Sequence, residues 1–272
     1  MTTTWQTGDL PAEVRVGPLG WVRVVRRGVP LALVVFGGLA LLLTLRLVER
    51  PVFGPRRPVT PWITQGVCRM ALMLIGLSCH TEGRPMRHKG AVVSNHVSWL
   101  DIFVLNAAQK IYFVAKSEVA AWPLIGWLAR ATGTLFIRRD AREAKVQKTL
   151  FEARLDSDHR LLFFPEGTST DGQRVLTFKP TLFQAFFAPG LHETVWIQPV
   201  TLVYHAPAGC DGRFYGWWGE MEFAPHLFKT LAARKNGGVT VTYHAPLAAV
   251  DFSDRKALAR ACEAAVRSGL PV

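Results

Sequence analysis

The heptapeptide NHVSWLD at residues 95–101 follows the apolar run of residues 91–93 and precedes the apolar, helix-like run of residues 102–105. This order predicts a strand, a turn and a helix, the unit from which layered α/β folds are built. Within the turn, a histidine precedes an aspartate by five positions. Side chains at i and i+5 point about 140° apart on one regular helix. His96 and Asp101 can therefore meet only if His96 lies in the turn and Asp101 lies about one turn inside the helix.

The His96–Asp101 pair indicates a catalytic base. In neutral imidazole, one ring nitrogen donates a hydrogen bond and the other accepts one. Asp101 would hold the donor nitrogen, which leaves the second nitrogen free to take a proton from a hydroxyl group. The alternative is a histidine that only caps or packs against a helix start, and a lone histidine favours that interpretation. A second motif further along the chain shifts the balance toward catalysis.

That second motif is FFPEGT at residues 163–168, which ends another apolar strand with a turn that contains a carboxylate and a glycine. Two further blocks occur in order: KSE (116–118), PLIG (123–126) and GTLFIRR (133–139) form the first, and IQPV (197–200) the second. With the His-x4-Asp (HX4D) motif, these blocks resemble the glycerolipid acyltransferase family, whose best-known member makes phosphatidic acid from lysophosphatidic acid. The resemblance covers roughly residues 85–205.

The resemblance implies that a fatty acyl group moves from an acyl thioester to a lysolipid hydroxyl. A hydroxyl is a poor nucleophile at neutral pH, so a base must remove its proton as it attacks; such bases typically contribute about 10²–10⁴-fold. His96 takes this role, and Asp101 fixes its tautomer and stabilises imidazolium. The acyl thioester of an acyl carrier protein or of coenzyme A is the co-substrate. No cofactor and no metal ion are expected.

The FFPEGT turn is expected to bind substrate. The backbone N–H of Gly167 or Thr168, on a tight turn at a strand end, is the candidate donor to the tetrahedral oxyanion. Glu166 cannot stabilise an oxyanion while it is ionised. We therefore expect Glu166 to orient the polar head of the acceptor or a neighbouring cation.

Three basic residues are expected near the acceptor headgroup. Arg138 and Arg139 follow a strand, so their side chains start on opposite sides of it. One would bind an anionic headgroup while the other faces solvent, and two solvated arginines are the alternative. Lys179 occupies the basic position that follows the third motif of the family, which implies a second anion contact.

The position after Glu-Gly-Thr bears on the identity of the acceptor. Relatives that accept a phosphate commonly carry Arg there, whereas this chain has Ser169, with Asp171 two residues later. In this respect the chain is most similar to the lyso-ornithine lipid O-acyltransferase subgroup, whose acceptor is zwitterionic. Lyso-ornithine lipid is therefore the expected acceptor. The alternative is 1-acyl-glycerol-3-phosphate, as the acceptor or as a second substrate.

The composition points to a membrane. The chain of 272 residues has a net charge of +12 and is 49% hydrophobic. The basic charge accompanies eighteen consecutive uncharged residues at 28–45, which favours adhesion to lipids over nucleic acid, and no nucleic-acid-binding module is present. This run is at the lower limit for crossing a bilayer, and both flanks are basic. A span and a segment within one leaflet both remain open.

We expect a flexible tail at residues 1–18, membrane-anchoring helices at residues 19–80 and an acyltransferase domain at residues 81–272. In family relatives, two such helices form a membrane-docking hairpin; a pair of ordinary core helices is the alternative.

The four cysteines show no C-x-x-C spacing, which favours free thiols. The expected location is a bacterial inner (cytoplasmic) membrane with the catalytic domain facing the cytosol.

Beyond about residue 85, short apolar strands alternate with helix-length segments. This alternation predicts an α/β fold, a mixed and largely parallel sheet flanked by helices. The expected strands are residues 91–94, 111–114, 134–137, 161–164, 195–204 and 239–243, and the expected helices are residues 99–109, 119–130, 141–155, 178–187 and 253–267. Loops that leave the carboxyl ends of parallel strands form the sites of such folds.

Three other classes of protein fit parts of the pattern. A hydrolase would use the His–Asp pair on water, but the chain has no G-x-S-x-G motif. A metal enzyme would need further His or Cys residues at ligand spacing. A non-catalytic membrane-binding protein remains open, and it would tolerate the loss of His96.

The aromatic run FYGWW at residues 214–218 is expected to line an acyl-chain path, to rest at the membrane interface or to pack in the core.

Overall fold

The computed structural model describes residues 5–6, 11, 15–122, 124–137, 144–157 and 159–271. Its α-helices are α1 (Pro18–Phe53), α2 (Thr60–Ile75), α3 (Leu100–Ala108), α4 (Ile125–Thr132), α5 (Ala144–Asp156), α6 (Phe223–Ala232) and α7 (Arg255–Ser268). Its strands are β1 (Ser78–Glu82), β2 (Gly90–Ser94), β3 (Tyr112–Lys116), β4 (Leu135–Ile137), β5 (Leu161–Phe163), β6 (Trp196–His205), β7 (Gly238–Tyr243) and β8 (Leu247–Ala248). Short 3-10 helices are η1 (Ser117–Ala121), η3 (Pro180–Phe187) and η4 (Ala249–Asp251).

The strands form one mixed sheet in the order β1-β7-β6-β2-β5-β3-β4, and β8 pairs with β6. Strands β6, β2, β5, β3 and β4 are parallel, whereas β7 and β8 run antiparallel to β6. Strand β2 is buried along its whole length, as expected for a central parallel strand covered on both faces. The predicted α/β fold with a largely parallel sheet is therefore confirmed.

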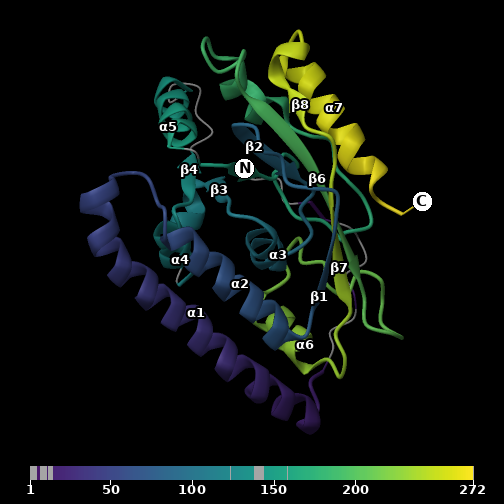
Figure 1. The fold of residues 1–272 in the computed structure, drawn as a ribbon. Helices are drawn as coiled ribbons and strands as arrows, with labels where there is room; N and C mark the ends of the chain where they lie inside the picture. The colour runs from purple at the N-terminus through teal and green to yellow at the C-terminus, as the bar shows by residue number, and fades with distance from the viewer. Residues whose placement is uncertain are drawn as a thin grey trace.

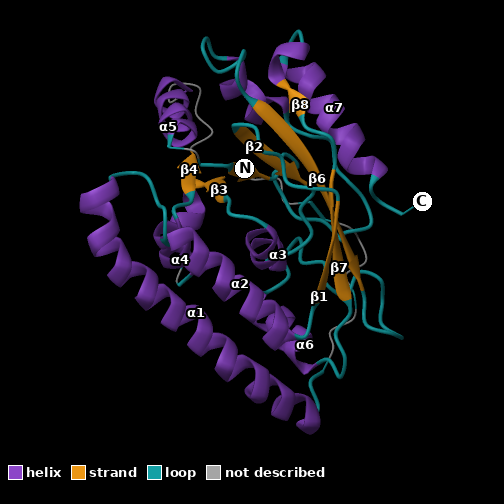
Figure 2. Ribbon diagram, in the orientation of Figure 1, coloured by secondary structure: helices purple, strands orange, loops and turns teal. Residues whose placement is uncertain are grey.

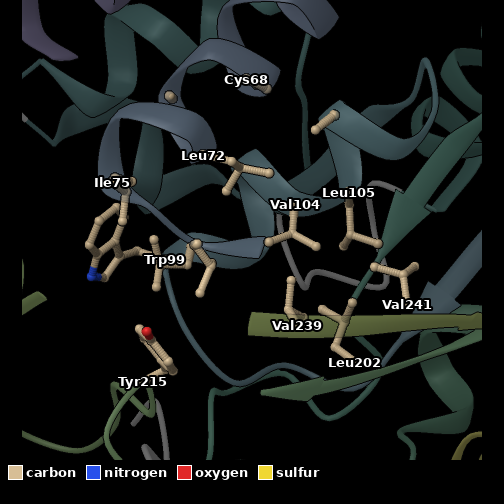
Figure 3. Packing of buried hydrophobic residues seen from close by; sticks show 14 of the residues in the cluster. Cys68, Leu72, Ile75, Trp99, Val104, Leu105, Leu202, Tyr215, Val239 and Val241 are labelled. Carbon is tan, nitrogen blue, oxygen red and sulfur yellow. The ribbon is translucent and has the colours of Figure 1, made fainter. Parts of the chain in front are cut away.

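Helices cover both faces of the sheet and create two cores (Figure 2). Successive side chains of a strand point to opposite faces, so Val92 packs into one core while Ala91 and Val93 pack into the other. Figure 3 shows the first core, in which α2 packs on α3 and α3 packs on β6 and β7. The second core packs α5, η3 and α7 against the opposite face.

Most of the predicted elements of the catalytic domain are confirmed, and two need correction. The predicted helix at residues 119–130 is divided into η1 and α4, and Leu124 between them has a φ of 61°. The predicted helix at residues 178–187 is the 3-10 helix η3. Strands β1 and β8 were not predicted, because β1 is an exposed polar edge strand without apolar alternation and β8 has only two residues.

Helices α1 and α2 form an antiparallel hairpin that lies against α3, α4 and α6 (Figure 1). Gly38 permits their close approach, because a Cβ atom there would lie 2.3 Å from Cγ2 of Val67. The buried carboxylate of Glu49 closes the hairpin by accepting hydrogen bonds from the N–H groups of Val59 (2.8 Å) and Thr60 (3.1 Å). Helix α1 has 36 residues and is long and apolar enough to cross a bilayer by length and composition.

Candidate active site

The two motifs meet at one edge of the sheet. Strands β2 and β5 are parallel neighbours in which Val93 pairs with Phe163. The turn at residues 95–99 and the turn at residues 164–168 therefore leave the sheet side by side at its carboxyl edge. Strand β3 is parallel to β5, so η1 begins at the same edge. This edge is where α/β folds of this kind place their sites.

His96 and Asp101 are in contact, as the local pattern predicts. The Nδ1 atom of His96 lies 2.7 Å from Oδ2 of Asp101. His96 lies in the turn, whereas Asp101 is in the first turn of α3 and is fully buried. The same Oδ2 atom accepts hydrogen bonds from the N–H groups of Val97 (2.8 Å) and Ser98 (3.1 Å). Asp101 thus orders the turn that carries the histidine.

The His96 imidazole is held by contacts at its ring face and at Nδ1, which leave Nε2 without a hydrogen bond to the described residues. Its ring stacks on Phe164, with the centroids 4.0 Å apart and the planes at 10°. Because Asp101 accepts from Nδ1–H, the neutral ring has its lone pair on Nε2. Within the residues that the structure describes, Nε2 has no hydrogen-bond partner. The side chain is 22% exposed, so a substrate hydroxyl can reach it.

Tyr204 on β6 completes the environment of Asp101, a contact that no local sequence pattern predicts. Its hydroxyl donates a hydrogen bond of 2.7 Å to Oδ1 of Asp101. Burial and the neighbouring Asp101 carboxylate raise the pKa of Tyr204 well above its ordinary value, so the phenol remains a donor. The Asn95 side chain aligns β6 with the turn by bonding both the N–H (2.8 Å) and the carbonyl (2.9 Å) of Leu202.

Glu166 holds the backbone of His96. Its Oε1 accepts from the N–H of His96 at 2.8 Å, and its Oε2 accepts from the N–H of Leu176 at 2.9 Å. The carbonyl of His96 accepts in turn from the N–H of Thr170 at 2.9 Å. Glu166 is buried, so its carboxyl group contacts the backbone and not a headgroup at the surface, where we expected it to act. Through these two hydrogen bonds, the Glu166 side chain joins the two ends of the loop of residues 166–176 and binds the backbone of His96 to this loop.

The candidate oxyanion donors differ from each other in this structure. The N–H of Gly167, a residue with a φ of 74°, donates to the carbonyl of Phe164 at 3.0 Å and is thus used within the turn. The N–H of Thr168 has no hydrogen-bond acceptor among the described residues. Thr168 is therefore the better candidate of the two.

Of the three basic residues predicted near the headgroup, the structure describes Lys179. Lys179 lies beside the turn, because its N–H donates to the carbonyl of Pro165 at 2.9 Å. Arg138 and Arg139, which we predicted to contact the headgroup, lie outside the described residues; β4, which precedes them, ends at Ile137. Among the described residues, no cluster of His, Cys, Asp and Glu suits a metal ion.

The carboxylate of Asp171 is buried and paired with a cation. Its Oδ2 lies 3.0 Å from a guanidinium nitrogen of Arg174, whose side chain is half exposed. Its Oδ1 accepts from the N–H of Gln173 at 3.1 Å. Arg174, which the sequence pattern did not single out, therefore places a cation in the same loop as Ser169.

The aromatic run packs mainly in the core. Phe214, Tyr215 and Trp218 are buried, and the N–H of Trp217 donates to the carbonyl of Val97 at 2.9 Å. This run thereby packs against the turn of residues 95–99 and also lies beside the loop of residues 166–176, because a Cβ atom at Gly216 would lie 3.0 Å from the carbonyl oxygen of Asp171.

A buried histidine fixes the tryptophan of the HX4D motif. The indole N–H of Trp99 donates to Nδ1 of His226 at 2.9 Å, and Nε2 of His226 lies 3.0 Å from the carbonyl of Gly216. Burial and the neighbouring Lys229 lower the pKa of His226 to about 3, so the ring is neutral at physiological pH. A neutral ring protonated at Nε2 satisfies both hydrogen bonds.

A family model described as Acyltransferase matches residues 77–203. Over 271 residues, the chain is 57% identical to the lyso-ornithine lipid O-acyltransferase of Rhodobacter capsulatus, an alignment that covers 99% of this chain and 98% of that protein. The chain therefore belongs to the acyltransferase family, and it is an enzyme of that class.

Two further relatives extend the comparison. The 1-acyl-sn-glycerol-3-phosphate acyltransferase of Neisseria gonorrhoeae is 36% identical over 152 residues, which cover 54% of this chain and 56% of that protein. The crystal structure of the 1-acyl-sn-glycerophosphate acyltransferase PlsC from Thermotoga maritima superposes with a TM-score of 0.56 at 20% identity, covering 90% of this chain and 96% of that chain. At this identity, the likeness to the crystal structure concerns the fold.

Replacing Tyr204 by phenylalanine should lower kcat while leaving KM for the acceptor nearly unchanged. The variant removes one hydrogen bond to a buried carboxylate, and such bonds are worth about 1.5–3 kcal/mol, so we expect a loss of roughly tenfold or more. Steady-state kinetics measures the effect. Tyr243→Phe is the matched control, because that buried hydroxyl has no partner among the described residues. Equal activities of the two variants would refute the role of Tyr204.

Glu166 should make the folded protein less stable as pH rises. Burial raises the pKa of Glu166 to about 8, although the N–H donors of Leu176 and His96 oppose the shift. Between the ordinary value of about 4.5 and that pH, the folded state binds a proton that the unfolded state has released, so the free energy of unfolding falls as pH rises. Melting temperatures in detergent at several pH values should show a flatter profile for Glu166→Gln. Parallel profiles for variant and wild type would contradict this.

Proposed function

We propose that the chain transfers a fatty acyl group from an acyl thioester to the hydroxyl of lyso-ornithine lipid, forming ornithine lipid. The observation that carries the proposal is a histidine held by Asp101 at Nδ1 and open at Nε2. It occurs in a chain that is similar over almost its whole length to a protein of that named activity.

The geometry supports a base-catalysed transfer. Nε2 of His96 takes the proton of the lysolipid hydroxyl while the hydroxyl oxygen attacks the thioester carbonyl carbon. The oxyanion that forms meets the N–H of Thr168. Collapse of the tetrahedral intermediate breaks the carbon–sulfur bond, and His96 returns its proton to the leaving thiolate. Asp101 stabilises the imidazolium between these steps.

The second candidate is 1-acyl-glycerol-3-phosphate as acceptor, with phosphatidic acid as product. Arg174 favours it, because a half-exposed guanidinium lies in the loop that follows the FFPEGT turn. Its partner Asp171 already offsets part of that charge, which suits a zwitterionic headgroup better than a phosphate. Lyso-ornithine lipid therefore remains the first candidate.

The acyl donor is the thioester of an acyl carrier protein or of coenzyme A. Both donors are anionic, and the net charge of +12 favours their approach. Purified enzyme assayed with each donor and with each lysolipid, with the lipid products resolved, would assign donor and acceptor together.

We infer that α1 lies within one leaflet instead of crossing the membrane. Near the start of α1, Arg23 donates to the carbonyl of Ala232 at 2.6 Å, and Arg27 donates to that of Leu231 at 2.9 Å. Near its end, Glu49 binds the start of α2. A helix of 36 residues is about 54 Å long, well beyond the ~30 Å hydrocarbon core. A crossing helix would have to break the contacts at one end.

The location is proposed to be a bacterial inner (cytoplasmic) membrane, with the catalytic domain facing the cytosol. Free cysteines support the reducing side: Cys68 and Cys262 are buried, Cys79 and Cys210 are exposed, and none forms a disulfide.

The replacement His96→Ala should lower turnover by at least about 100-fold, because it removes the base. The membrane-bound fraction should stay at the wild-type value, whereas the melting temperature should fall, because buried Asp101 loses one of its four hydrogen-bond donors. His80→Ala, at an exposed position on β1, is the matched control and should keep full activity. A His96→Ala enzyme that retained more than about a tenth of wild-type turnover would exclude the general-base role.

The replacement Ser169→Arg should shift acceptor preference toward lysophosphatidate. An added charge-assisted hydrogen bond to phosphate is worth about 1.5–3 kcal/mol, or one to two orders of magnitude in preference. The measurement is the ratio of kcat/KM for the two lysolipids in wild type and variant, with Ser169→Gln as an uncharged control of similar length. A wild-type ratio that strongly favours lysophosphatidate and does not change in the variant would reject lyso-ornithine lipid as the acceptor.

A further inference from the structure

We propose that Trp122, Leu124 and Trp127, here called the tryptophan patch, form a membrane contact in addition to the α1–α2 hairpin. The patch inserts into the same bilayer surface as the hairpin and turns the carboxyl edge of the sheet toward the lipid. This inference stands on the membrane association of α1 and not on the identity of the acceptor.

The patch consists of large, exposed apolar side chains that belong to neither of the two hydrophobic cores. Trp122 is 45% exposed, Leu124 is 52% exposed and Trp127 is 64% exposed. Leu124 also has a φ of 61°, which is unfavourable for a residue with a side chain, yet the side chain it presents contributes little to the core. Grouped exposed apolar residues mark interaction surfaces, and tryptophan is enriched where a bilayer meets water.

The patch is continuous with the hairpin. Helix α4, which carries Trp127, packs against both α1 and α2 (Figure 1). Arg57, in the loop between α1 and α2, donates to the carbonyl of Ala131 at the end of α4 at 2.8 Å. The neighbouring parts of the hairpin are also apolar and exposed, with Phe53 at the end of α1 and Trp62 near the start of α2. A bilayer that covers the hairpin is therefore the occupant within reach of the patch.

The position of the patch links it to catalysis. It follows η1, which begins where β3 ends, and β3 is parallel to β5. The patch therefore lies at the same edge of the sheet as His96 and the FFPEGT turn. A contact at this edge would add a second point of membrane attachment beside the hairpin and would hold the base at the depth where the hydroxyl of a membrane-bound lysolipid lies.

Site-specific fluorescence tests the contact directly. In the full chain with Cys79→Ser and Cys210→Ser, a single cysteine is introduced by Trp127→Cys and labelled with the environment-sensitive dye NBD. The matched control is Val250→Cys, because Val250 is an exposed apolar residue on η4, beside the amino end of β6 at the opposite edge of the sheet. Both proteins are bound to vesicles of phosphatidylcholine and phosphatidylglycerol, with and without lipid-borne nitroxide quenchers.

The label at position 127 should show blue-shifted emission and quenching by shallow nitroxides, whereas the label at position 250 should remain water-like. Equal, water-like signals at both positions would overturn the proposal. A blue shift at position 127 that depends on protein concentration in detergent and is not quenched in vesicles would indicate a second copy of the chain, and it would also overturn the proposal.

Kinetics provides an independent readout. The double variant Trp122→Ser/Trp127→Ser should raise KM for lysolipid in vesicles by about tenfold or more, since each large side chain loses its apolar burial. Its kcat with a short-chain lysolipid below its critical micelle concentration should match that of wild type, which shows that the fold and the chemistry are intact. Unchanged KM in vesicles would count against the patch, whereas loss of His96 removes activity in both assays.

Discussion

The buried carboxylate of Asp101 is the group on which the rest of the site depends. A buried charge is costly unless it is fully hydrogen-bonded. Asp101 meets this condition with four donors, namely the ring of His96, the N–H groups of Val97 and Ser98, and the hydroxyl of Tyr204. Three of these donors shape the turn after β2, and the fourth comes from β6. The requirement to satisfy one carboxylate therefore fixes the tautomer of the base, the path of the turn and the position of a neighbouring strand.

The order of the strands makes this arrangement possible. Strand β2 lies between β5 and β6, so both neighbours contribute side chains to its carboxyl end. From the β5 side, Glu166 binds the N–H of His96, while Phe164 stacks on the imidazole. From the β6 side, Tyr204 reaches Asp101. His96 is thus held at its backbone, its ring face and its carboxylate partner, while no group among the described residues hydrogen-bonds its Nε2 atom.

The sequence predicts the parts of this site that depend on local order. Central parallel strands are apolar runs, and the His96–Asp101 contact follows from a strand, a turn and one helical turn. The contacts of Tyr204 and Glu166 join residues 103 and 70 positions apart, and no local pattern encodes them. The pairing of Asp171 with Arg174 is likewise not predicted from the sequence, because it depends on the path of the loop. Strand β1 was missed because an exposed polar edge strand carries no apolar period.

The N-terminal hairpin and the turn that contains His96 are both in contact with helix α3. Helix α3 begins with the turn that carries His96, and α2 packs directly on α3. The α1–α2 hairpin, whose helix α1 is apolar and long enough to cross a bilayer, is therefore one layer away from His96, with α3 between them (Figure 3). A lysolipid keeps its acyl chain in the bilayer while only its polar hydroxyl has to reach Nε2. In the proposed reaction, the partly exposed His96 at the sheet edge would therefore meet that hydroxyl without extraction of the lipid from the bilayer.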